Sequence, residues 1–83
     1  MWGAMTFKEL VTTWNSGEWR GAGARLSRES KVPPNYISNY LNGLYIPEGE
    51  RLIAIAKVLR IKPEEVVASA KEGRRQREKS EHS

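Results

Sequence analysis

Four small polar residues recur at helical spacing in the middle of the chain: Asn35, Ser38, Asn39 and Asn42. Residues three and four apart share one helix face, so the pattern predicts a polar, uncharged stripe. Asn and Ser weaken a helix by roughly 0.5 kcal/mol each relative to Ala, so an ordinary solvent face would carry other residues. An Asn amide offers a donor beside an acceptor, which matches the major-groove edge of adenine. A merely polar helix is the alternative, and the stripe alone does not decide.

The other face of this segment carries apolar residues at i, i+3, i+4 and i+7: Ile37, Tyr40, Leu41 and Leu44. This spacing predicts burial against a core. Pro34 suits the first position of a helix, and Gly43 suits the left-handed residue that ends one. We therefore expect a helix over residues 34–42, which is too short to be stable alone in water and must be held by neighbours.

The composition fits one small domain. Of 83 residues, 39% are hydrophobic, which is enough for a single core. There is no Cys and no Asp, and the one His, His82, is almost the last residue, so we expect no metal site, no cofactor and no enzyme. No apolar run approaches the roughly 20 residues of a membrane span. No signal peptide is recognisable, so the expected location is cytoplasmic, without a membrane partner.

The charge balance favours a polyanionic partner. The chain has 14 Lys and Arg against 10 acidic residues, a net charge of +4. Many small basic proteins bind no nucleic acid, so this is support rather than proof. Arg25, Arg28 and Lys31 are the basic positions of the second expected helix. They could contact a phosphate backbone, or they could form a solvated helix face.

Periodicity and end signals predict five helices, over residues of about 7–15, 22–30, 34–42, 48–59 and 63–72. Thr6 and Glu9 have the spacing of a capping box at the start of the first helix. Gly21 and Gly23 each weaken the second by about 1 kcal/mol relative to Ala, but would let another helix approach closely. Pro63, followed by two glutamates, is a typical start for the fifth.

The two ends of the chain look different from the middle. Residues 1–5 form a flexible lead in this interpretation, and residues 6–72 form the folded domain. Residues 73–83 are charged and lack apolar side chains, so we expect them to be disordered or a frayed extension of the last helix. Three arginines of this tail could reach a phosphate backbone or be simply solvated: Arg74, Arg75 and Arg77.

Between residues 26 and 67, several short motifs occur in a fixed order with no insertion between them. They are Leu26-Ser27, Val32, Tyr36-Ile37-Ser38, Asn42-Gly43, Pro47, the segment 52–59, Ile61 and Glu64-Glu65-Val66. This series resembles the helix-turn-helix of the lambda-repressor-like (Cro/C1-type, XRE) family. The resemblance implies an all-α, compact five-helix domain that binds double-stranded DNA. Its third helix would be the recognition helix and would lie in the major groove.

The resemblance also implies roles by position. Asn35 and Asn39 would contact bases, with Ser38 near them. Tyr36 and Asn42 would contact the sugar–phosphate backbone. We expect backbone contacts also from the basic residues Arg25, Arg28 and Lys31. Phosphate contacts would position the domain, and base contacts would give it sequence preference.

Three residues depart from the family pattern. Gly23 stands where many members have Gln at the start of the second helix. Pro33 replaces the usual Ser or Thr cap, so no hydroxyl can bind the first N–H groups of the recognition helix. Pro34 can offer a base only an apolar contact. We therefore expect fewer direct hydrogen bonds per half-site and greater reliance on Asn35 and Asn39.

These observations predict a sequence-specific DNA-binding transcriptional regulator, a small repressor of bacterial or phage type. So short a recognition helix reads few base pairs, so we expect a homodimer on a palindromic operator, paired through Trp2, Trp19, Tyr45 or the fifth helix. The alternative is a protein-interaction module of the same fold, an antitoxin or anti-repressor. It would bind a protein partner through Trp2, Trp14, Trp19 or Tyr45. Such an interface has no special need for the Asn and Ser stripe.

Overall fold

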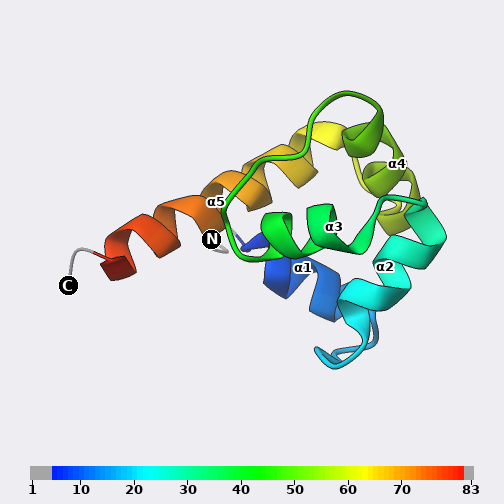
Figure 1. The fold of residues 1–83 in the computed structure, drawn as a ribbon, viewed down its shortest axis with the longest axis horizontal. Coiled ribbons are helices and arrows are strands. Elements are labelled where there is room, and N and C mark those ends of the chain that lie inside the picture. Colours follow the sequence, from blue (N-terminus) through cyan, green and yellow to red (C-terminus); the bar gives the residue numbers. More distant parts are fainter. Residues whose placement is uncertain (1–4, 82–83) are drawn as a thin grey trace.

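All five expected helices are present in the computed structural model, which describes residues 5–81 (Figure 1). They are α1 (Phe7–Trp14), α2 (Ala22–Ser30), α3 (Pro34–Leu41), α4 (Gly49–Leu59) and α5 (Pro63–Glu81). The first four begin and end within one residue of their predicted bounds, and there is no strand within residues 5–81, so the all-α class is confirmed. The first four residues of the predicted lead over residues 1–5, with Trp2, lie outside the described part, as do the last two residues, with His82.

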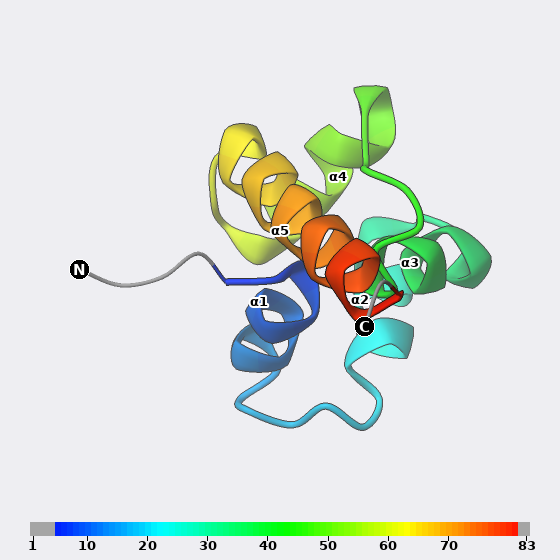
Figure 2. The same ribbon diagram turned by 90° about the vertical axis from the view of Figure 1, so that its left-hand side faces the viewer.

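The core forms where the apolar faces of all five helices meet. Its largest fully buried side chains from the helices are Phe7, Val11, Leu26, Ile37, Ile55 and Val66. α2 packs against α3 and α4, while α5 packs against α4 and α1 (Figure 2). The predicted burial of Leu44 in the apolar stripe was wrong, because this side chain is 43% exposed. α3 ends at Leu41, and the left-handed turn at Gly43 directs the following residue out of the helical register.

The capping box predicted at the start of α1 is confirmed. The Glu9 N–H donates to Thr6 Oγ1 at 3.1 Å, and the Thr6 N–H donates to Glu9 Oε1 at 2.9 Å. Backbone and side-chain hydrogen bonds from Thr6 stabilise the carboxylate and lower the pKa of Glu9. The box fixes the first turn of α1, which places Phe7 in the core.

Thr6→Ala should destabilise the domain by about 1 kcal/mol, because it removes the acceptor that satisfies an end N–H group. Urea unfolding measures this, with the exposed Thr13→Ala of the same helix as the control, for which we expect no loss. The lowered pKa of Glu9 means that its contribution is complete above its ordinary value of 4.5 and is lost as pH falls through the lower folded value. The effect should therefore shrink in acid; a pH-independent effect equal to that of the control would contradict the capping assignment.

The fifth helix does not end at residue 72, as predicted, but continues to Glu81. Of the two expectations for the tail, disorder or an extension of the last helix, residues 73–81 agree with the extension. Ion pairs one turn apart support this segment. Arg75 Nη2 lies 2.8 Å from Glu72 Oε2, and Arg74 Nε lies 3.3 Å from Glu78 Oε1. The hydrogen bond from Arg75 lowers the pKa of Glu72 and raises that of Arg75. No helix among the described residues is long and apolar enough to span a membrane.

Candidate nucleic-acid interface

Two serines of α2 hold the turn that joins it to α3. Ser27 Oγ donates to the Val32 carbonyl at 2.6 Å. Ser30 Oγ donates to the Leu26 carbonyl at 2.6 Å and accepts from the Val32 N–H at 3.3 Å. Lys31 takes a left-handed conformation, with φ 64°, at the end of α2. The buried Val32 closes this turn, which therefore fixes the direction in which α3 leaves α2.

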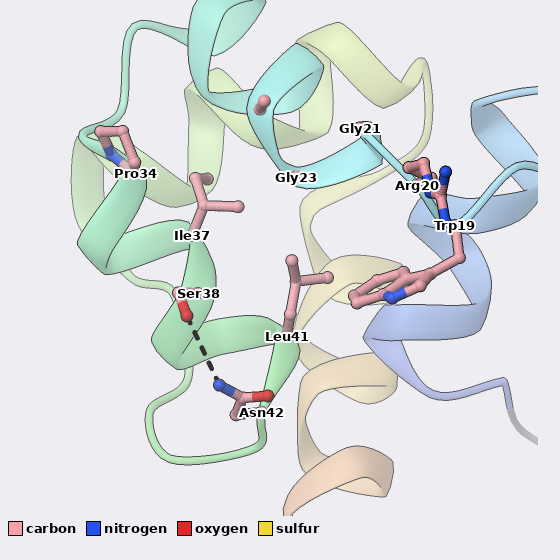
Figure 3. Close-up of a pocket in the computed structure, with 10 residues that line it drawn as sticks. Trp19, Arg20, Gly21, Gly23, Pro34, Ile37, Ser38, Leu41 and Asn42 are labelled. Atoms are coloured by element: carbon pink, nitrogen blue, oxygen red, sulfur yellow. Dashed lines mark hydrogen bonds between the residues drawn. The ribbon is translucent and has the colours of Figure 1, made fainter.

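α3 is amphipathic, with the two faces that its sequence predicts. Ile37 and Tyr40 are 1% and 4% exposed and anchor it in the core. The opposite side, here termed the α3 polar face, consists of Asn35, Ser38, Asn39 and Asn42. Asn39 is half-buried and the other three are exposed. Asn42 Nδ2 donates to Ser38 Oγ at 3.4 Å (Figure 3). The predicted base-contacting side chains thus lie together on the surface.

Tyr36 lies at one edge of this face, against α4. The guanidinium carbon of Arg51 stands 4.0 Å from the centre of the Tyr36 ring, a cation–π contact. Both residues and Asn39 line a hollow of about 340 Å³. Burial raises the pKa of the neighbouring Tyr40, while the positive charge of Arg51 opposes that rise. Arg51 is a basic residue beside the polar face that sequence reasoning missed, because only the packing of α4 brings it there.

The three predicted basic positions of α2 differ in their surroundings. Arg25 is half-buried, with its guanidinium 4.1 Å from the centre of the Trp14 ring. Its Nε lies 2.6 Å from Glu29 Oε2, and its Nη1 donates to Asn15 Oδ1 at 3.0 Å. These contacts hold Arg25 against α1. Arg28 and Lys31 are exposed. Their side chains are therefore better placed to meet a phosphate than that of Arg25.

A groove of about 380 Å³ separates the other edge of the polar face from the start of α2 (Figure 3). Six of its lining residues are Trp19, Arg20, Gly23, Pro34, Leu41 and Asn42. A Cβ on Gly23 would lie 3.2 Å from Leu41 Cδ1, so this glycine lets α3 approach α2 closely. No side chain caps the N-terminus of α2, which begins after Gly21. Arg20 is a second basic residue beside the polar face that sequence reasoning did not single out. The signal that could have indicated it is its position directly before a helix start that has no side-chain cap.

Two helices joined by a tight turn, the second of them exposing a polar face, define a helix-turn-helix domain. A family model described as Helix-turn-helix matches residues 24–66, more than half of the chain. The chain therefore belongs to the Cro/C1-type (XRE) helix-turn-helix family, a family of DNA-binding regulators that are not typically enzymes. Neither the curated proteins nor the solved structures include a match.

Proposed function

We propose that this protein is a sequence-specific transcriptional regulator that binds double-stranded DNA, a small repressor of bacterial or phage type. This proposal rests mainly on the α3 polar face, which is uncharged, has three of its four residues exposed, and belongs to a helix anchored by the buried Ile37 and Tyr40. A helix of this size fits the major groove. Asn35 and Asn39 would pair with base edges, and Ser38 would lie near them. Tyr36 and Asn42 would contact the sugar–phosphate backbone.

Positive groups on both edges of the α3 polar face support this proposal. On one side, Arg20 adjoins the open N-terminus of α2, a combination that suits a phosphate oxygen. On the other side, Arg51 stacks on Tyr36. Lys31, exposed at the turn, completes the set together with Arg28, which is also exposed and stands three residues earlier. A duplex centred on α3 would meet cations along both strands, which positions the helix before any base is read.

Lys31→Gln and Arg20→Gln should each weaken binding evenly for all DNA sequences. Losing one phosphate contact reduces the slope of log affinity against log salt by about 0.9. Fluorescence titrations at several salt concentrations measure the slope. Lys62→Gln is the matched control, since it removes the same charge from the α4–α5 connection, on the side away from α3 (Figure 2). An unchanged slope for both variants would remove these two residues from the interface.

The proposal includes the binding of two copies of the protein to one palindromic operator. A recognition helix of eight residues reads few base pairs, so two copies on half-sites about 34 Å apart would supply enough specificity. Tyr45 and Ile53, which are 62% and 51% exposed, offer apolar surface for such pairing. Sedimentation with and without a palindromic duplex tests this. A complex of one protein per duplex at saturation would contradict the homodimer.

Selection of bound duplexes from a random pool tests the proposed function itself. We expect an enriched motif that contains adenine at the positions read by Asn35 and Asn39, repeated with two-fold symmetry at a spacing of about one helical turn. A pool that stays random after repeated selection would contradict sequence-specific binding.

A protein-interaction module of the same fold, an antitoxin or anti-repressor, is the second candidate. The exposed Trp19 and Tyr45 favour it, since aromatic residues often anchor protein interfaces. Titration with random-sequence duplex at low and moderate salt separates the two functions. Binding that weakens as salt rises supports DNA as the partner, and no binding at low salt supports a protein partner.

A further inference from the structure

The face of α5 that packs on the domain changes its character at Gly73. Its residues follow the spacing i, i+3, i+4, i+7 and i+11 and are Val66, Ser69, Ala70, Gly73 and Arg77. The first three are buried, whereas Arg77 is exposed. After Gly73 the helix projects beyond the body of the domain (Figure 1). The projecting part, residues 74–81, therefore carries a cation in the position that apolar or small residues occupy earlier.

The projecting part begins beside the end of the recognition helix. A Cβ on Gly43, which follows α3, would lie only 2.8 Å from the Gly73 carbonyl oxygen. A hollow of about 390 Å³ lies at this junction and is lined by Thr6, Lys8, Leu41, Asn42, Gly73, Gln76 and Arg77. Asn42 is also the last residue of the α3 polar face. The surface proposed to face DNA thus continues without a break onto α1 and α5.

This continuation is positively charged. Lys8 and Arg77 line the hollow, and no carboxylate is among its lining residues from the described chain. The Nζ atom of Lys8 lies 4.4 Å from the centre of the Trp19 ring, so it also adjoins the groove on the other side of Asn42. Glu78, in the projecting part, pairs with Arg74, and Glu72, just before it, pairs with Arg75. The charged residues that line the hollow beside Asn42 are therefore both basic, Lys8 and Arg77.

We propose that the projecting part of α5, together with Lys8, binds the phosphate backbone of duplex DNA that flanks the base pairs read by α3. This inference rests on the proposed function and extends it to a second contact region. Eight residues of helix span about 12 Å, which corresponds to about three or four base pairs. Contacts of this kind add affinity without sequence preference. They would compensate for the hydrogen bonds that Gly23 and Pro34 cannot make.

The test compares two duplexes: the shortest one that retains the selected motif, and the same duplex with about six further base pairs of arbitrary sequence at each end. At 0.1 M salt we expect the unaltered protein to bind the longer duplex about eight-fold more tightly for each added phosphate contact, which follows from a slope of about 0.9 per contact. We expect Arg77→Gln and Lys8→Gln each to bind the longer duplex about eight-fold more weakly than the unaltered protein does, and the shorter duplex equally well. Arg75→Gln is the matched control, because it removes the same charge from a position of α5 that does not line the hollow.

The outcomes separate this inference from the function on which it rests. The inference would be overturned if Arg77→Gln and Arg75→Gln gained equally in affinity from the shorter to the longer duplex, with equal helix content by circular dichroism. If binding depends on Asn35 but gains nothing from added length, only the α5 contact is wrong. If neither duplex is bound in an Asn35-dependent way, the proposed function is wrong. A loss of self-association without DNA, confined to Arg77→Gln in sedimentation, would overturn the inference in favour of pairing between two copies.

Discussion

Asn35→Ala is expected to weaken binding to the preferred duplex by about 1–3 kcal/mol and to abolish the preference at one base pair. Asn35 lies on the α3 polar face, on the side away from the buried Ile37. Its amide makes no hydrogen bond within the part of the chain that the structure describes, so both its donor and its acceptor are available for a base edge. Asn39→Ala should have a similar effect at a second base pair. Competition with duplexes altered at single positions measures both.

Loss of folding cannot produce this result. Ala favours a helix more than Asn does, so Asn35→Ala should leave the unfolding midpoint unchanged or raise it. The substitution also leaves the net charge unchanged, so the salt dependence should not change, in contrast to Lys31→Gln. If Asn35→Ala bound all duplexes as the unaltered protein does, α3 would not be reading bases through this residue.

The elements of the fold could be predicted because their signals are local. Thr6 and Glu9 define the start of α1 within four residues of sequence. Pro34 and Gly43 delimit α3, and the two faces between them follow from helical spacing alone. The grouping of Asn35, Ser38 and Asn42 on one exposed face was predictable for the same reason.

The surroundings of the site could not be predicted, because they depend on packing between distant segments. Arg51 reaches Tyr36 only through the position of α4. Arg25 is spaced like any solvated basic residue, yet Trp14 and Glu29 hold it. The local stop signal at Gly73 also fails, because α5 continues through this residue to Glu81. A Cβ at Gly73 would meet only Thr6 Cβ, at 3.9 Å, but the Gly73 carbonyl lies in close contact with the turn after α3.

That contact leads to the largest expected effect on stability, for Gly43→Ala, which we expect to lower the free energy of unfolding by more than about 3 kcal/mol. Gly43 has φ 75°, a left-handed conformation that costs an Ala about 1–2 kcal/mol. In addition, the new Cβ would lie 2.8 Å from the Gly73 carbonyl oxygen and 3.0 Å from its carbonyl carbon. These are backbone atoms of a helix anchored by Val66 and Ala70, so they cannot move aside without disturbing the core.

Gly17→Ala separates the two causes. Gly17 has φ 82°, and a Cβ there would meet nothing within 4 Å, so only the conformational cost of about 1–2 kcal/mol should remain. Urea unfolding of both variants measures the difference, which reports the crowding between the end of α3 and α5. Because small domains have a total stability of about 5–15 kcal/mol, the effect at Gly43 should also be visible as a large fall in the unfolding midpoint. Equal losses in both variants would mean that α5 does not pack against the turn after the recognition helix.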